Sequence, residues 1–251
     1  GLELSSDFAG SSDFKLGAAY TRNALNSLGG ELRVTASLGR EDELSFDFYQ
    51  PVDHKARWFI EPELFWSREN YRIWEEDVNT AELELTGWST IFGVGRNFSS
   101  TDRLRLEYQF GRGDINVVTG EPGLLDEDRI DIGELRLQYA HDSLNSIWFP
   151  TRGALHKLEY LYAAESLGAS SDYQQASANG VVVHSFGKNT GVLNYELGYS
   201  FDDEATIERW YRLGGFGRLS GLAPDQLIGR HVALASFAFY RKLNDMEIIS
   251  T

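Results

Sequence analysis

The sequence contains no cysteine, and this absence excludes a disulfide framework and any metal site built on thiolates. Long hydrophobic runs are also missing: with a mean hydropathy of −0.34, no segment reaches the roughly 18 apolar residues of a membrane-spanning helix. Acidic residues outnumber basic ones, and the net charge of −15 argues against nucleic acid as a partner. A length of 251 residues is enough for one large β domain or two small ones.

Aromatic residues are abundant, at 13 % of the chain, and aromatic side chains favour strands. Apolar and polar residues alternate with a period of two along most of the sequence. The clearest segment covers residues 104–110, where Leu, Leu, Tyr and Phe alternate with Arg, Glu and Gln. This alternation predicts β-strands, and no helical periodicity of comparable strength occurs.

The alternation predicts about twelve strands of roughly 8–14 residues, lengths that suit the tilted strands of a transmembrane barrel. The predicted strands cover residues 2–9, 13–23, 30–40, 43–50, 56–68, 80–98, 102–113, 129–141, 153–166, 173–186, 190–202 and 230–243.

The connections between these strands alternate in character. Short turns rich in Asn, Asp, Ser, Gly or Pro are predicted at residues 24–30, 51–55, 97–102, 141–150 and 187–190. Longer and more acidic loops are predicted at residues 69–80, 114–128, 165–172 and 202–229. Short turns at one end and long loops at the other are typical of an outer-membrane barrel, whose periplasmic turns are the short ones.

A soluble β-sandwich also alternates, but it turns its apolar side chains toward a core. Two observations favour the membrane. Aromatic residues lie near strand ends, as in an interfacial girdle, and charged residues occupy the middle of the polar face, as in a wet lumen. The expected lumen residues are Arg33, Asp47, Glu61, Glu63, Arg105, Glu107, Glu134, Arg136, Lys157, Glu159 and Glu196. We therefore predict an all-β fold, a transmembrane antiparallel β-barrel, and keep a soluble ligand-binding sandwich as the alternative.

Residues 210–230 form an unusual stretch, W-Y-R-L-G-G-F-G-R-L-S-G-L-A-P-D-Q-L-I-G-R. Its glycines and Pro224 disfavour both helix and strand. Its large apolar side chains, such as Trp210 and Leu222, require burial, and its arginines require acceptors. We therefore predict a long loop that packs against the rest of the protein.

Two motifs resemble those of the BamA/TamA outer-membrane superfamily. Residues 141–153 resemble the family's D-x-x-x-N-x-x-F-P-T-R-G turn and fall on a predicted periplasmic turn. The matching positions are Asp142, Asn145, Phe149, Pro150, Thr151, Arg152 and Gly153.

The second motif lies in the long loop. Leu219-Ser220-Gly221-Leu222 resembles the V-R-G-F/Y tip of the family's sixth outer loop, which folds back into the lumen. Ser220 stands where the family has arginine, so the arginine contact to strand thirteen is not expected, and Arg218 is the candidate to replace it. The resemblance implies an inward loop with Arg218 near a lumen carboxylate.

The string L-G-G-F-G-R-L-S-G-L, followed by L-I-G-R and F-Y-R-K-L, is most similar to the barrels of patatin-like type V secretion proteins, the type Vd autotransporters. So are Y-Q-P-V-D at residues 49–53 and G-A-A-Y-T-R at residues 17–22. This resemblance implies an N-terminal patatin lipase domain, one POTRA domain and a barrel of sixteen strands. Residues 1–251 would then be the barrel translocator domain, a fragment without the lipase domain, the POTRA domain or the last strands.

No motif predicts chemistry in this chain. The nucleophile elbow G-x-S-x-G of patatin-type lipases is absent, and the closest match, residues 168–172, is interpreted as an outer-loop turn. Gly215-Phe216-Gly217 is not followed by a helix, as a phosphate-binding loop would be. The five histidines lack metal-ligand spacing, and the acidic loops lack the alternating pattern of a calcium loop. We predict no catalytic residue, no metal and no cofactor.

These observations leave three hypotheses for function. The first is a bacterial outer-membrane barrel that anchors an N-terminal patatin-like lipase passenger and helps to secrete or display it. The second is a BamA/TamA-type barrel assembly factor, and the third is the soluble secreted sandwich. Expected partners are outer-membrane lipid, the chain's own passenger, the barrel assembly machinery during folding and a second copy of the chain. Twelve strands alone would leave residues 2–8 and 232–240 as edges, which further strands or a partner chain should cover.

Overall fold

The computed structural model describes residues 2–6, 12–39, 41–75, 78–120, 129–202, 209–215, 218–223 and 225–243. Among them, helical structure is limited to one 3₁₀ turn, η1 (Glu165–Leu167), and no helix is long and apolar enough to cross a membrane. The strands are β1 (Leu2–Ser6), β2 (Ser12–Arg22), β3 (Glu31–Gly39), β4 (Glu41–Pro51), β5 (Trp58–Glu75), β6 (Val78–Asn97), β7 (Asp102–Thr119), β8 (Arg129–Asp142), β9 (Arg152–Ala163), β10 (Tyr173–Phe186), β11 (Asn189–Ser200), β12 (Tyr211–Leu213), β13 (Leu227–Gly229) and β14 (His231–Arg241).

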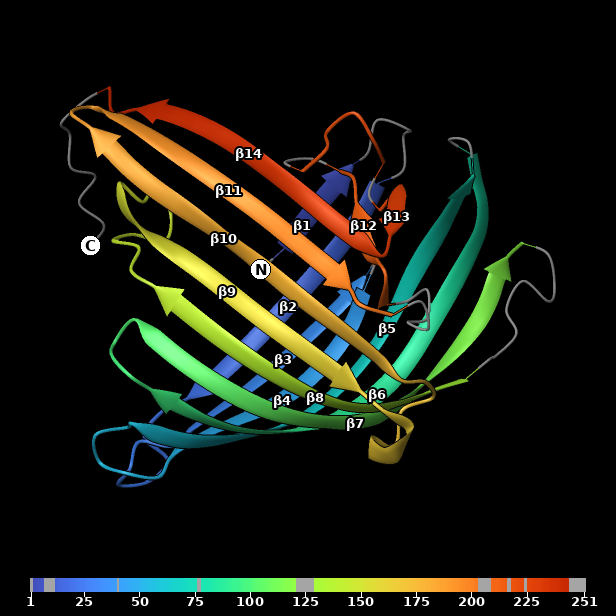
Figure 1. Cartoon of the computed structure of the whole chain (residues 1–251), viewed down its shortest axis with the longest axis horizontal. Helices are drawn as coiled ribbons and strands as arrows, with labels where there is room; N and C mark the ends of the chain where they lie inside the picture. Colours follow the sequence, from blue (N-terminus) through green and yellow to red (C-terminus); the bar gives the residue numbers. More distant parts are fainter. Residues whose placement is uncertain are drawn as a thin grey trace.

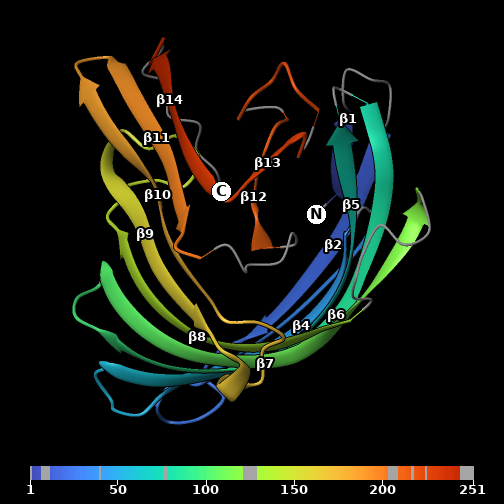
Figure 2. The ribbon, with the colours of Figure 1, turned by 45° about the vertical axis from the view of Figure 1, so that its right-hand side comes forward.

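Twelve strands form one antiparallel sheet in the order β1 to β11 followed by β14. The sheet curls into a deep trough, with β1 and β14 at its two edges (Figures 1 and 2). In the described part of the chain, β1 pairs only with β2, and β14 only with β11, so the curled sheet is open. The strand number and the neighbour-to-neighbour antiparallel order confirm the predicted fold class, a transmembrane antiparallel β-barrel.

The two faces of the sheet have the polarity of a membrane protein. On β7, Leu106 is 46 % exposed on the convex face, whereas the next residue, Glu107, is only 3 % exposed on the concave face. Large apolar side chains are also exposed on other strands, including Tyr20, Leu38, Phe46, Leu64, Trp88, Phe92, Leu137, Leu197 and Phe237. A soluble sandwich would bury such residues between its sheets. This inverted distribution is that of a membrane barrel and excludes the sandwich.

Two predicted loops are partly strand. The segment 69–80 was expected to be an outer loop, but β5 continues to Glu75, and Tyr71 pairs with Leu83 of β6. Likewise β7 continues to Thr119, beyond the predicted end at residue 113. A transmembrane strand needs only about 9–11 residues, whereas β6 has 20. The hydrogen-bonded ladder between β5 and β6 therefore extends beyond the thickness of the lipid. There both faces of the sheet meet water, so acidic side chains on either face do not interrupt strand pairing.

The predicted long loop lies inside the trough (Figure 2). It was expected to contain no regular structure, yet β12 and β13 form a short antiparallel ladder in which Tyr211 pairs with Gly229 and Leu213 with Leu227. Gly214 follows β12 with φ 141°, and a Cβ at this position would strike the carbonyl oxygen of Ala223. Glycine permits this close approach, so the composition that disfavours long strands lets the loop fold back on itself.

Candidate functional site

An ion-pair network lines the concave face at the centre of the sheet. Arg105 lies between two carboxylates, with its Nε 3.2 Å from Glu61 Oε2 and 2.9 Å from Glu107 Oε1. Arg136 on the next strand lies 3.5 Å from Glu107 and continues the network along β8 and β9. Register produces this arrangement, because Glu107 is the direct cross-strand partner of Arg136. Because carboxylates and guanidinium groups alternate, each buried charge has an opposite charge beside it, which offsets the free-energy cost of removing that charge from water.

Glu134 on β8 is the most enclosed carboxylate of this wall, with 1 % exposure. Its Oε1 accepts a hydrogen bond of 2.5 Å from the Tyr173 hydroxyl and an ion pair of 2.5 Å from Arg209. Arg136 lies 3.5 Å from its other oxygen. The base of the long loop is therefore fixed to the buried charge network of the wall.

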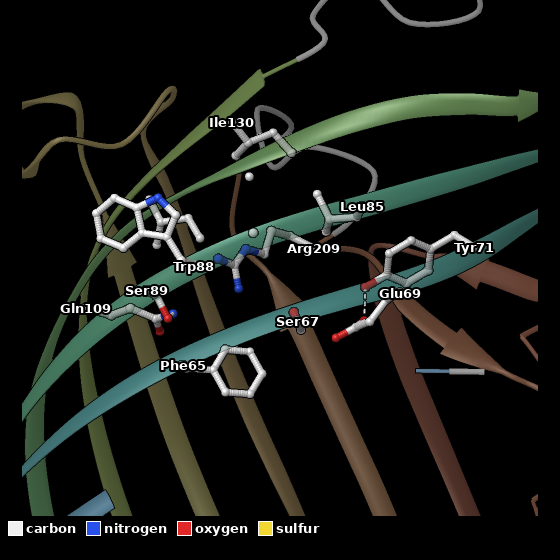
Figure 3. A pocket seen from close by; sticks show the side chains of 13 residues that line it. Phe65, Ser67, Glu69, Tyr71, Leu85, Trp88, Ser89, Gln109, Ile130 and Arg209 are labelled. Carbon is white, nitrogen blue, oxygen red and sulfur yellow. Dashed lines mark hydrogen bonds between the residues drawn. The ribbon is translucent and has the colours of Figure 1, made fainter. Parts of the chain in front are cut away.

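Arg209 was missed by the sequence analysis, because the stretch singled out there begins one residue later, at Trp210. The Arg209 side chain lies among side chains of the neighbouring strands β5 to β8 (Figure 3). It enters a pocket lined by Phe65, Ser67, Glu69, Tyr71, Leu85, Gly87, Trp88, Ser89, Gln109, Gly113, Ile130 and Ile132. The backbone carbonyl of Arg209 also accepts a 3.0 Å hydrogen bond from Gln175 of β10.

A second arginine attaches the loop to β5, beside the pocket that Arg209 enters. Arg212 of β12 stacks over the ring of Tyr71 on β5, with its Cζ 4.3 Å from the ring centroid. The Tyr71 hydroxyl donates to Glu69 at 2.5 Å (Figure 3). The carboxylate thus polarises the phenol that faces the guanidinium, and cation–π contacts of this kind strengthen where water is excluded.

The loop tip carries the inward motif. Both carboxylate oxygens of Glu196 accept from Arg218 Nη2 at 2.6 Å, so the structure places Arg218 against a residue of the predicted polar face. Backbone hydrogen bonds shape the rest of the tip: Gly215 N–H donates to Leu222 at 3.1 Å, and Leu222 N–H donates to Leu219 at 3.0 Å. Ser220 and Gly221 lie within this tight turn. Phe216, Gly217 and Pro224 lie outside the described residues.

The three arginines contact side chains of three different strands. Arg209 binds β8, Arg212 binds β5 and Arg218 binds β11. The loop therefore crosses the trough from side to side (Figure 2). Its cations meet an inner wall rich in carboxylates, which explains how a glycine-rich segment keeps a defined position.

The motif turn between β8 and β9 is held by side-chain hydrogen bonds. Asn145 Oδ1 accepts from the N–H groups of Thr151 at 2.9 Å and Arg152 at 3.1 Å, and Asn145 Nδ2 donates to Thr151 Oγ1 at 2.9 Å. Asp142 accepts from the Leu144 N–H at 3.1 Å. Gly153 has φ +105°, and a Cβ there would strike the Ser143 carbonyl. Most motif positions therefore build the turn itself.

The same turn also reaches another strand. The ring of Phe149 packs edge-on against Tyr240 of β14, with 6.3 Å between centroids. The Tyr240 hydroxyl donates to the carbonyl oxygen of Pro150, and Ser185 of β10 donates to the Thr151 carbonyl at 2.7 Å. The turn therefore links β8 and β9 to β10 and to β14 at the edge of the sheet.

The Asn145→Ala variant is expected to loosen this turn. The substitution leaves the N–H groups of Thr151 and Arg152 without their acceptor, and we expect a loss of about 1–2 kcal/mol in the free energy of unfolding. Urea unfolding of the refolded barrel measures the change. Asn23→Ala, in the β2–β3 connection, is the control and should change stability by less than about 0.5 kcal/mol. Equal losses at both positions would contradict the proposed role of Asn145.

Asp53 closes the β4–β5 turn in a comparable way. Partial removal of water raises the pKa of Asp53, because it disfavours the charged carboxylate. Hydrogen bonds from the N–H groups of Lys55 at 2.8 Å and Trp58 at 3.1 Å stabilise the charged form and lower the pKa. The balance lowers the pKa of Asp53 below its ordinary value. The stabilising effect of this charge is therefore present at neutral pH and is lost as the pH falls through the depressed pKa.

The turn region also contains a Ser–His–Asp arrangement that the sequence analysis did not find. His141 lies 3.0 Å from Ser143 Oγ and 2.8 Å from Asp102 Oδ1. The Ser143 hydroxyl, however, lies 3.1 Å from both the carbonyl and the N–H of Ala154. It closes the β8–β9 hairpin, so we assign these three residues to the architecture of the turn.

The segment closest to a nucleophile elbow is a structural turn as well. Ser170 Oγ accepts from the N–H of Asp131 at 2.8 Å, and the Ser170 N–H donates to the Asp131 carbonyl at 2.9 Å. Asp172 accepts from the Glu165 N–H at 2.7 Å. These contacts attach the β9–β10 connection to β8. Across the described ranges, no group of His, Asp and Glu has the arrangement of a metal site.

The apolar exterior, the charged inner wall and the inward loop define an outer-membrane β-barrel. Residues 25–245 match the Omp85 superfamily domain. Because this match covers most of the chain, the chain belongs to the Omp85 superfamily. Barrels of this superfamily are in general not enzymes, and membership places the chain in the bacterial outer membrane.

Among solved structures, the chain is similar to BamA from Haemophilus ducreyi lacking POTRA domains 1–3. The TM-score is 0.77 at 13 % identity, with 99 % of this chain and 53 % of that chain covered. At this identity the likeness concerns the fold, and the chain spans about half the length of the BamA structure. No curated protein matches the chain.

Proposed function

We propose that the chain is the translocator barrel of a type V secretion protein, which anchors an N-terminal patatin-like lipase in the outer membrane and helps to secrete or display it. The observation that carries the proposal is the polar inner wall with its docked loop. A passing extended polypeptide needs partners for its backbone N–H and C=O groups. The carboxylates and guanidinium groups of the wall supply such partners, and the exterior remains apolar.

The similarity of the loop strings to patatin-like type V barrels supports the choice of passenger. The glycines and the single arginine of residues 213–222 carry that similarity, and this arginine, Arg218, binds Glu196. A passenger, a POTRA domain and further barrel strands are parts of the same proposal.

A BamA-type assembly factor is the second candidate, and the similarity of the fold to BamA favours it. An assembly factor would pair a strand edge of its own with incoming strands of other barrels through main-chain groups, whereas a translocator would keep its barrel closed.

Depletion of the full-length protein in its own cells separates the two candidates. The translocator proposal predicts unchanged amounts of unrelated outer-membrane barrels, together with loss of lipase activity from the cell surface or medium. A general fall in outer-membrane barrels, with induction of the envelope stress response, would favour the assembly factor. Unchanged lipase activity and unchanged barrels would contradict both.

The Arg218→Gln variant tests the docking of the loop tip. Because this ion pair is partly exposed, we expect less than about 1 kcal/mol of lost stability, but faster protease cleavage within residues 211–229. Mass spectrometry of the fragments locates the cleavage. Arg33→Gln removes another exposed pair, the one with Glu31, and should leave the cleavage rate unchanged. Equal cleavage in both variants would contradict the assigned role of Arg218.

A further inference from the structure

An arginine on the outer surface of β6 lies between two aromatic rings. The Cζ of Arg96 is 5.2 Å from the Trp58 ring centroid and 5.0 Å from that of Phe98. Register brings these residues together, because Trp58 at the start of β5 is the cross-strand partner of Arg96. All three side chains are exposed, Trp58 at 47 % and Phe98 at 56 %.

Arg96 belongs to the lipid-facing side of the sheet. Along β6, the exposed residues Phe92 and Val94 alternate with Ile91, which is buried on the concave side. Arg96 continues the exposed series, about 7 Å beyond Val94 at the usual rise of a strand. The strand ends at Asn97, where the turn to β7 begins. The guanidinium therefore lies at the periplasmic boundary of the apolar band, at the level of lipid headgroups.

This cation has no protein anion. Among the residues that the structure describes, the Arg96 side chain contacts the two rings and forms neither a hydrogen bond nor an ion pair. The carboxylate at the end of the same turn, Asp102, is bound by Ser99, Thr101, Tyr139 and His141. A guanidinium carries five N–H donors and no acceptor, so its position beside lipid calls for an external anion.

We propose that Arg96, Trp58 and Phe98 form a binding site for the phosphodiester headgroup of a phospholipid in the periplasmic leaflet. The planar guanidinium can bind two phosphate oxygens at once. Cation–π contacts with the two rings fix the orientation of the guanidinium. The rings themselves lie at the membrane–water interface, where Trp is favoured. The acyl chains would lie along Val94 and Phe92.

The neighbouring turn adds positive charge to this site. Lys55 lines a surface hollow together with Phe98. Anionic phosphatidylglycerol should therefore bind better than zwitterionic phosphatidylethanolamine, although both carry the phosphodiester. The exposed apolar surface above Arg96 selects a lipid over a free phosphate ion.

Native mass spectrometry of the detergent-purified full-length protein, titrated with phosphatidylglycerol, tests the site. The Arg96→Gln variant should bind the lipid about fivefold more weakly, the effect of one basic residue at an anionic membrane surface. Arg57→Gln is the matched control, because Arg57 lies in the adjoining turn and already has Asp53 as its partner at 3.6 Å. It should change the affinity less than about twofold.

Two further variants separate a loss of lipid binding from a loss of folding. Heat-modifiable gel mobility shows whether each variant is folded. Arg96→Lys keeps the positive charge but cannot bind two phosphate oxygens with one planar group. Trp58→Leu removes one of the two cation–π contacts. Both variants should bind the lipid with an affinity between those of the parent protein and Arg96→Gln. Unchanged affinity in the Arg96 variants, or an equal loss in Arg57→Gln, would overturn the proposal. Displacement of the lipid by an equal concentration of inorganic phosphate would also overturn it, because it would identify a free-anion site.

Discussion

The Leu106→Arg variant should fail to accumulate as a folded barrel in the outer membrane. Leu106 is exposed on the convex face, and its cross-strand partners Val94 and Leu137 are exposed there as well. An arginine on the lipid face costs about 2–4 kcal/mol at the bilayer midplane and less toward the interfaces, so we expect about 1–3 kcal/mol at Leu106, whose partner Val94 lies one outward position inside Arg96. The free energy of unfolding is a small difference between large opposing contributions. A loss of this size is therefore a large fraction of the total stability and is expected to block assembly.

A matched arginine on the other face provides the control. Gln138 lies on the inner wall 3.1 Å from Glu159, so the new guanidinium of Gln138→Arg would meet both water and a carboxylate. We expect this variant to accumulate as the parent protein does. Glu107→Gln should also assemble, because Arg105 keeps Glu61 and Arg136 keeps Glu134 as partners. Heat-modifiable mobility in membrane fractions measures assembly, and equal amounts of Leu106→Arg and Gln138→Arg would contradict the assignment of faces.

The Glu134→Leu variant should have the largest effect on the inner wall. It leaves Arg136 and Arg209 without a carboxylate that is almost completely buried. Breaking a buried pair by removing one partner costs about 3–5 kcal/mol. Because the arginines remain partly exposed, we expect about 3 kcal/mol, together with release of the loop base from β8.

Urea unfolding in lipid bilayers, followed by tryptophan fluorescence, measures this loss. Glu159→Leu is the control, because Glu159 is more exposed and its partner Arg136 keeps Glu134. It should cost less than about 1 kcal/mol. The double variant Glu134→Leu, Arg209→Met should recover part of the loss by removing a cation that has lost the Glu134 carboxylate. Equal losses at Glu134 and Glu159 would contradict the assignment of Glu134 as the anchor of the loop.

The sequence alone predicts the strands and their faces well, because lipid and lumen water select opposite side chains at alternate positions. Residues 104–110 show this most clearly, and β7 has the predicted polarity. Strand ends are less predictable. Beyond the lipid both faces meet water, so the alternation weakens although the backbone pairing of Tyr71 with Leu83 continues.

Contacts of the loop are only partly predictable from the sequence. The sequence draws attention to Arg218 as a loop cation, and Arg218 contacts Glu196. The identity of that carboxylate, and the contact of Arg209 with Glu134, depend on how far the sheet curls and how the loop crosses it. Neither quantity is encoded in a local pattern. The arrangement of Ser143, His141 and Asp102 cannot be predicted from the sequence either. Asp102 lies far from the other two residues in the chain, and strand pairing places it opposite His141.

An alternate-position cysteine scan along residues 104–110 tests the central claim, a barrel wall with lipid outside and a charged lumen inside, most directly. The chain has no cysteine of its own, so each variant carries a single thiol. In folded protein in liposomes, thiols at positions 105, 107 and 109 should react with a membrane-impermeant maleimide. Thiols at positions 104, 106, 108 and 110 should resist it, and fluorophores attached there before insertion should be quenched by brominated lipid. Equal maleimide reactivity on both faces, without lipid quenching, would contradict the account.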